Sequence, residues 1–142
     1  MSDRSNLLIV FPRTLPDATL PVIASILRSP PSSVELGADI DVYDVDRGGY
    51  DELQELSRRQ IPYSAWWGAG CEYAAGAEAF DGREIASVEC SATGGIVVHV
   101  HHLRGTVSRK ELAEVARYRR LRRRAAIARM TPQAIAALTI AA

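Results

Sequence analysis

The sequence of 142 residues is short of several features that would place it in a defined class. It has two cysteines, Cys71 and Cys90, and they lack the Cys-x-x-Cys spacing of zinc and redox motifs. No apolar run approaches the length of about 18 residues that a membrane-spanning helix needs. Residues 1–6 lack the basic and then apolar layout of a secretory signal. We therefore expect a cytoplasmic protein with reduced thiols and no membrane partner.

Lysine and catalytic motifs are also scarce. Lys110 is the only lysine among 17 basic residues. Neither cysteine lies in a nucleophile motif, and Ser91 is not part of a G-x-S-x-G elbow. A pairing of Cys71 with His101 or His102 stays open, because catalytic partners meet in space rather than in sequence. The sequence therefore predicts a protein without enzymatic activity and without a cofactor.

What remains is the composition of an ordinary globular protein, with 47% hydrophobic and 24% charged residues. A chain of this length can bury a hydrophobic core without disulfides or metals. No internal repeat is visible, and no linker is long enough to separate two domains. We expect one domain, 1–142, that consists of an acidic body at 1–103 and a basic helical region at 104–142.

The charges are segregated along the chain although the formal net charge is zero. Residues 1–103 carry seven arginines and fifteen Asp and Glu residues, a net charge of −8. Residues 104–142 carry ten basic residues and two glutamates, a net charge of +8. Such segregation indicates either a charged partner or pairing within the chain.

The hydrophobic pattern predicts an α+β fold with a small mixed or antiparallel sheet. Apolar residues at positions 20, 23, 24 and 27 recur at helical spacing, and two prolines then end the helix. Several strands follow one another in the second half, which argues against a doubly wound parallel sheet. The expected strands are 6–11, 34–45, 61–67, 83–90 and 96–103. We expect the order β-α-β-α-β-β-β, followed by an Arg-rich helix and a short last helix.

Local signals set boundaries inside this pattern. The alternation of polar and apolar residues slips after Tyr43, which predicts a bulge or a strand end at 43–44. Asp81-Gly82 predicts a tight turn between two strands. Asp51 and Gln54 have the spacing of a capping box and predict the start of a short helix.

The Arg-rich segment 108–130 dominates the last third of the chain. Ser108 and Glu111 have the spacing of a capping box, which predicts where this helix starts. A seam of apolar residues at roughly helical spacing predicts one packed face: Leu112, Val115, Ala116 and Leu121. Four arginines are predicted to be displayed to a partner: Arg119, Arg120, Arg123 and Arg124.

Three interpretations fit this helix. It can lie on nucleic-acid phosphates, or it can grip an acidic protein surface. It can also pair with the acidic strand of its own chain, which would account for the balance of charge. That strand carries four aspartates: Asp39, Asp41, Asp44 and Asp46. Together with carboxylates of the following helix, these aspartates can imitate the charge spacing of a nucleic-acid backbone and attract a nucleic-acid-binding protein.

Aromatic residues cluster at 63–73, beside a Gly-rich stretch at 68–76 that has neither dinucleotide-binding nor P-loop spacing. Trp66 and Trp67 are adjacent, so on a strand they point to opposite faces and at most one is expected to face the core. The other Trp, together with Tyr73, is a candidate contact residue, because aromatics are enriched in binding hot spots. The alternative is a Trp that packs beneath the C-terminal helices.

Two stretches have the outline of a metal site. His99 and His101 share one face of an expected strand, with Cys90 on the partner strand as a possible third ligand. Residues 44–49, followed by Glu55, resemble a calcium-binding loop, but the fifth position lacks a side-chain ligand. We expect neither stretch to bind a metal, because an exposed polar sheet face and a solvated turn explain them.

A small, charge-segregated chain without catalytic motifs is similar, as a class, to small phage- and plasmid-borne inhibitors of host defence, including anti-CRISPR proteins. This resemblance rests on size, charge and the absence of motifs, and it assigns no residue roles. It implies a non-enzymatic inhibitor that acts on a nucleic-acid-handling protein or a ribonucleoprotein. Direct nucleic-acid binding by the Arg-rich helix is the first alternative. A small metal-dependent enzyme that uses His99 and His101 is the second.

Overall fold

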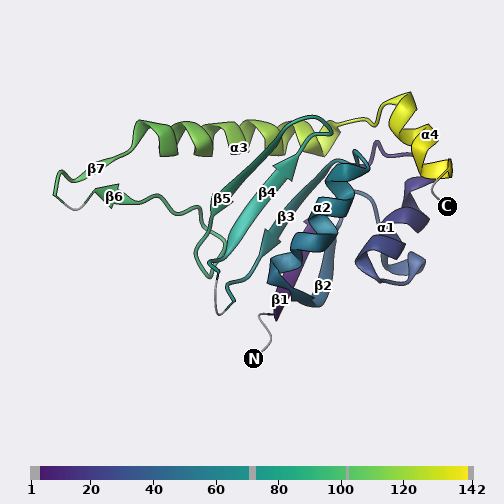
Figure 1. Cartoon of the computed structure of the whole chain (residues 1–142), viewed down its shortest axis with the longest axis horizontal. Coiled ribbons are helices and arrows are strands. Elements are labelled where there is room, and N and C mark those ends of the chain that lie inside the picture. The colour runs from purple at the N-terminus through teal and green to yellow at the C-terminus, as the bar shows by residue number, and fades with distance from the viewer. Residues whose placement is uncertain (1–3, 71–72, 102, 141–142) are drawn as a thin grey trace.

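The computed structural model describes residues 4–70, 73–101 and 103–140, which form an α+β fold around an antiparallel sheet (Figure 1). The five strands of this sheet lie in the order β2-β1-β3-β4-β5, and each neighbouring pair is antiparallel. Their bounds are Arg4–Val10 (β1), Asp39–Asp46 (β2), Tyr63–Trp67 (β3), Gly76–Phe80 (β4) and Ile85–Glu89 (β5). The predicted fold class is therefore confirmed.

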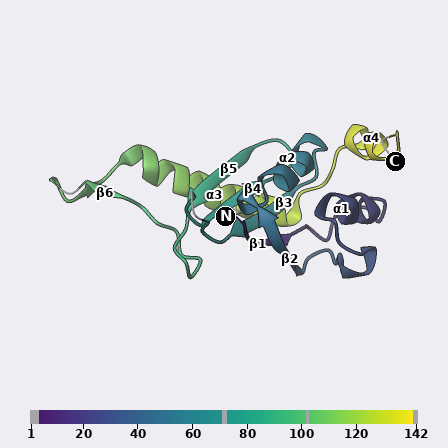
Figure 2. The same ribbon diagram turned by 60° about the horizontal axis from the view of Figure 1, so that its bottom comes forward.

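The remaining elements are helices and one small strand pair. The α-helices are α1 (Thr19–Leu27), α2 (Tyr50–Arg58), α3 (Arg109–Ile127) and α4 (Pro132–Ile140), and short 3₁₀ turns lie at Pro31–Ser33 and Arg47–Gly49. The small pair joins β6 (Val100–His101) to β7 (Thr106–Val107). α1 and α4 lie at one end of the molecule, and the pair formed by β6 and β7 lies at the other (Figures 1 and 2). Within the described residues, no helix is both long and apolar enough to cross a membrane.

One face of the sheet carries the larger hydrophobic core. Alternate residues of β1, β2 and β3 point into it because successive side chains of a strand point to opposite faces. The helices α1, α2 and α4 contribute the other side, and Phe11 and Leu56 are fully buried between these layers. We call this cluster the large core; its members include Leu7, Ile9, Phe11, Ile23, Leu27, Ile40, Val42, Leu53, Leu56, Tyr63 and Leu138.

The opposite face carries a smaller core beneath α3. β4 and β5 present alanines there, so the helix can approach the sheet closely. We call this cluster the small core; its buried members are Ala75, Ala77, Ala79, Ala86, Cys90, Tyr118 and Leu121. Trp66, Val88 and Ile96 pack against it while remaining partly exposed.

The helices on the two faces are offset, so each face of the sheet is partly uncovered. α3 contacts β3, β4 and β5, whereas α2 and α1 pack over β1, β2 and β3 through the large core. Ile85, which faces the α2 side of the sheet, therefore remains 42% exposed. On the α3 side, Asp39 and Asp41 of β2 are exposed because α3 does not reach that edge.

The predicted bulge in β2 is confirmed. Ser5 pairs with Val45 and Leu7 pairs with Val42, so Asn6 of β1 lies opposite two residues of β2. The extra residue restores the alternation, and Val45 is buried like Val42. Residues 43–44 are where the alternation of the sequence slips.

The expected long strand at 96–103 is wrong. Cys90 and Ile96 form an isolated bridge, and the chain then leaves β5. The next contacts explain this departure, because the backbone N–H of His99 donates to Glu111 Oε1 of α3 at 2.9 Å instead of to a strand. Beyond that point β6 pairs with β7 and not with β5.

Neither predicted capping box forms. Ser108 does precede the first residue of α3, but its hydroxyl makes no capping bond, and its carbonyl accepts the N–H of Leu112 at 3.0 Å. Glu111 is used by His99 instead. α2 begins at Tyr50, after Gly49 in a left-handed conformation, rather than after Asp51. Leu53 and Leu56 are buried as expected.

Candidate functional site

The candidate site is built on α3, whose two halves have different surroundings. The C-terminal half packs on the small core through Tyr118, Leu121 and Ala125, which recur at helical spacing and are at most 4% exposed. The predicted seam is therefore partly wrong, because Leu112 is 49% exposed and Ala116 is also exposed. The cause is geometric: the N-terminal half of α3 extends past the edge of the sheet (Figure 1), so little lies beneath it.

Four exposed arginines lie on α3 away from this packed seam. Leu121 and Ala125 point towards the sheet, and each residue turns the helix by about 100°, so Arg119 and Arg123, two positions from Leu121, point outward. Arg120 and Arg124 each precede a packed residue by one position and lie on the adjoining flank. We call these residues the arginine face: Arg119, Arg120, Arg123 and Arg124. Across the described parts of the chain, Arg124 alone of the four has a carboxylate partner, Glu84 at 3.8 Å.

The acidic strand β2 does not neutralise the arginine face. β2 forms one edge of the sheet, whereas α3 packs over β3, β4 and β5. No ion pair among the described residues joins α3 to Asp39, Asp41 or Asp46, and the side chain of Asp44 lies outside what the structure describes. Asp39 and Arg122 do line the same cavity of about 390 Å³. The two charged regions therefore approach each other at this cavity, but no ion pair among the described residues joins them.

The two tryptophans point to opposite faces, as the strand position predicts. The expectation that at most one of them faces a core is wrong, because the sheet has a core on each face. Trp66 packs against the small core beneath α3, and Trp67 packs against the large core. Trp67 Nε1–H donates to the carbonyl of Ala74 at 3.2 Å. Tyr73 is partly buried, with its hydroxyl 2.8 Å from Ser5 Oγ.

His99 and His101 follow the point where the chain leaves β5, and His101 lies in β6. His99 Nε2 is 2.7 Å from Glu89 Oε2, and this hydrogen bond raises the pKa of His99. Cys90 is buried in the small core, and burial raises the pKa of its thiol. In the part of the chain that the structure describes, no three His, Cys, Asp or Glu residues are grouped to hold a metal ion. Cys71 and His102, the other candidate partners for a Cys–His pair, lie outside the described residues.

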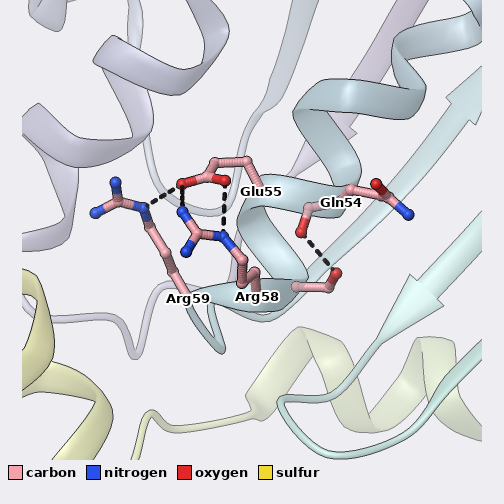
Figure 3. Close-up of polar contacts among 5 residues, drawn as sticks. Gln54, Glu55, Arg58 and Arg59 are labelled. Carbon is pink, nitrogen blue, oxygen red and sulfur yellow. Dashed lines mark hydrogen bonds and ion pairs between the residues drawn. The ribbon is translucent and has the colours of Figure 1, made fainter.

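Several residues of the loop that resembles a calcium-binding site make other contacts. Gly48 and Gly49 are buried with positive φ angles of 66° and 81°, which turn the chain into α2. Asp51 accepts an ion pair from Arg47 at 3.4 Å. Glu55, the expected last ligand, points between Arg58 and Arg59 (Figure 3), at 2.5 Å from Arg58 Nη2 and 2.8 Å from Arg59 Nε. Hydrogen bonds from Arg58 and then Arg59 lower the pKa of Glu55 to about 2.

Sequence reasoning missed one polar pair inside the fold. The hydroxyl of Tyr63, which is fully buried, donates to Glu78 Oε2 at 2.5 Å. Burial raises the pKa of the Glu78 carboxyl, and the hydrogen bond from Tyr63 opposes this shift. The available signal was a lone glutamate between alanines in 76–80, a segment whose hydrophobic period is weak.

Comparisons with protein-family models, with curated proteins and with solved structures find no match to the chain.

Proposed function

We propose that the protein is a non-enzymatic binding protein that attaches to a nucleic-acid-handling assembly through the arginine face of α3. The observation that carries this proposal is that Arg119, Arg120 and Arg123 are exposed and have no carboxylate partner among the described residues. Unpaired cations on a rigid helix attract phosphates, and a guanidinium matches two phosphate oxygens with its forked donors. An assembly that contains DNA or RNA presents such phosphates in a row.

The attachment has an inhibitory role in this proposal, in keeping with the class of small inhibitors that the chain resembles. α3 is held to the sheet by Tyr118 and Leu121, so its arginines are presented at fixed spacing rather than on a loose tail. A ligand that covers phosphates in this way competes with any other protein that needs them. The protein itself supplies no chemistry in this scheme.

The test measures binding of a fluorescent 20-nucleotide RNA and a DNA duplex to the full chain as salt is raised. We expect a triple Arg119/Arg120/Arg123→Ala variant to weaken binding of both probes. Its salt dependence should flatten, because each lost phosphate contact contributes about 0.9 to the slope of log K against log salt for duplex DNA and about 0.7 for a single strand. Loss of three contacts should therefore reduce the slope by about 2.7 for the duplex and about 2 for the RNA. Anisotropy of the labelled probe reports both quantities.

A matched control removes the same number of charges elsewhere. Arg28, Arg47 and Arg83 are exposed and lie outside α3, so Arg28/Arg47/Arg83→Ala lowers the net charge by the same three units. This variant should bind nearly as the unchanged chain does. Equal losses in both triple variants would mean that net charge and not the arginine face governs binding, and the proposal would then fail.

A second candidate function uses the acidic pole. Asp39, Asp41 and Asp46 are exposed on the edge strand and have no cationic partner among the described residues. They could attract the basic surface of a nucleic-acid-binding protein directly. Nuclease treatment separates the two candidates: capture of a nucleoprotein that survives nuclease and is lost in Asp39/Asp41→Asn favours the acidic strand. Capture that nuclease abolishes favours the arginine face.

A further inference from the structure

A cavity of about 510 Å³ lies between α2 and the part of the sheet that α2 leaves uncovered. Its described lining is rich in aromatic residues and contains a single carboxylate. The residues that matter here are Tyr50, Tyr63, Trp67, Tyr73, Glu78 and Ile85. This cavity is on the α2 face of the sheet, whereas the arginine face belongs to α3 on the other. The cavity therefore lies apart from the arginine face.

Glu78 is the unusual group in this cavity. Its position opposite Ala65 and Ser87 in the sheet turns it towards the α2 face, where it is partly buried. Tyr63 donates a hydrogen bond to one oxygen of its carboxylate, but no basic side chain among the described residues pairs with it. Charges that are withdrawn from water are normally paired, because losing hydration without compensation is costly. Among the described residues, Glu78 has no such counter-ion.

The aromatic residues around the cavity suit a cation. Positive groups are attracted to the faces of Trp and Tyr rings. One ring already shows this behaviour, because Arg47 Cζ lies 5.3 Å from the centroid of the Tyr50 ring. Arg47 is also paired with Asp51 at 3.4 Å, so its charge is directed to the helix surface and not to Glu78.

The wall of the cavity is fixed before any ligand arrives. Trp67 lies between two glycines, and a Cβ atom would approach the indole ring to 2.8 Å at Gly48 and 2.4 Å at Gly76. Its Nε1–H is held by the carbonyl of Ala74. A preformed wall reduces the entropy lost when a ligand binds.

From these observations we propose that the cavity binds an organic cation, a guanidinium or alkylammonium group, with Glu78 as its counter-ion. The hydrogen bond from Tyr63 orients one carboxylate oxygen and leaves the other for the ligand. The aromatic residues cover the rest of the cation. A neutral or acidic ligand would leave the carboxylate without its missing partner.

The test is a titration of the full chain with L-arginine amide, followed by NMR through the Trp67 indole N–H signal. A ligand of this size should bind with a Kd on the order of 1 mM. Glu78→Gln keeps the shape of the side chain and an acceptor for Tyr63 but removes the charge, so it should weaken binding at least about tenfold. Glu35→Gln removes an exposed carboxylate outside the cavity and should leave the affinity unchanged.

Two further variants keep the test decisive if Glu78→Gln is unstable. Tyr50→Ala removes a half-exposed ring and should weaken binding a few-fold. Arg47→Ala frees the Tyr50 face and removes a nearby positive charge, so it should strengthen binding. Binding that is unchanged in Glu78→Gln, or equal binding of propionamide in place of the cation, would overturn the proposal, as would no binding at all.

The same titration distinguishes two sources of the cation. A blocked Gly-Arg-Gly peptide that binds more than about tenfold tighter than L-arginine amide would identify the cation as a side chain of a protein segment, because the added backbone contacts contribute. Similar or weaker binding of the peptide would identify it as a free small molecule. The two experiments use different ligands, so failure of the arginine-face experiments would leave this result unchanged.

Discussion

The large core and the small core lie on opposite faces of one sheet, and they are built from different kinds of side chain. Leu, Ile, Phe and Tyr residues from four strands and three helices meet in the large core. Alanines dominate the small core, and only Tyr118 and Leu121 of α3 reach into it as large buried side chains. The first core therefore stabilises most of the body, whereas the second attaches one helix.

The difference explains why α3 can carry so much unpaired charge. Burial of apolar area stabilises a fold in proportion to that area. A helix that buries few large side chains therefore gains little stability from packing. The remaining surface of α3 is then free to be polar, and its exposed residues include eight Arg and Lys side chains. The body folds around one core, and the candidate binding helix is added through another.

The largest effect is expected from breaking the large core. Phe11→Ala removes a fully buried ring at the end of β1 and should lower the free energy of unfolding by about 3–5 kcal/mol. That loss is a large part of the total stability of a typical domain. Urea unfolding followed by circular dichroism measures it. Tyr43→Ala removes a ring that is 70% exposed and should cost less than about 0.5 kcal/mol.

Breaking the small core should have a smaller and more local effect. Leu121→Ala empties a site that is 1% exposed and should cost about 2–4 kcal/mol. Hydrogen exchange should accelerate in α3 while the amides of β1 stay protected, because α3 can open without the large core. Leu112→Ala is the same substitution at a position that is 49% exposed, and it should change little. An equal cost at both positions would show that the N-terminal half of α3 is packed after all.

On the side of the large core, Glu55 links Arg58, the last residue of α2, to Arg59, which follows it. Its pKa is lowered to about 2 from an ordinary value of 4.5, so its contribution is complete above pH 4.5 and is lost as the pH falls through 2. Because Arg58 is 71% exposed, solvent screens the pair, and Glu55→Gln should cost about 0.5 kcal/mol. Urea midpoints at pH 6 and pH 2 measure this, and the variant should show a smaller difference between them. Glu52→Gln, one turn away from the pair, serves as the control.

On the side of the small core, the weakest expected effect concerns His99. Its pKa is raised by the hydrogen bond to Glu89, with Glu111 as a further nearby carboxylate, so the contact is strongest while the imidazole is protonated. The contact should weaken as the pH rises through the pKa of His99, and it is complete below the unfolded value of 6.5. NMR shifts of the His99 ring across pH 5 to 9 measure this. Glu89→Gln should return the pKa towards 6.5; an unchanged pKa would contradict the assignment.

Four strands of the sheet were predictable because their signals are local. β4 at Gly76–Phe80 was not expected, because its small side chains and lone glutamate obscure the alternation. The slip in alternation at 43–44 located the bulge, and Asp81-Gly82 located the turn between β4 and β5. The absence of a long strand at 96–103 was not predictable, because these residues have β propensity but the N–H of His99 donates to Glu111 of α3. The capping box of Ser108 and Glu111 failed for the same reason, since Glu111 has a partner outside its own helix.

The charge of the candidate site was predictable from the sequence, but the packing of α3 against the sheet was not. Helical spacing is enough to place Arg119 and Arg123 on one exposed face. Helical spacing does not show that α3 extends beyond the sheet, because the width of the sheet depends on which strands pair in the folded chain. The contact between Tyr63 and Glu78, and the cavity beside it, could not be predicted from the sequence. The two residues are 15 positions apart and come together only because β3 pairs with β4.

The edge position of β2 has a consequence for the protein at high concentration. An edge strand offers unpaired backbone groups to any other strand that it meets, and charged side chains or a bulge discourage such encounters. β2 has both: a bulge at 43–44 and the exposed aspartates Asp39, Asp41 and Asp46. Two copies that approach edge to edge would bring these carboxylates together, so the strand repels itself. Replacing Asp39 and Asp41 by valine would remove that protection and turn β2 into a template for aggregation.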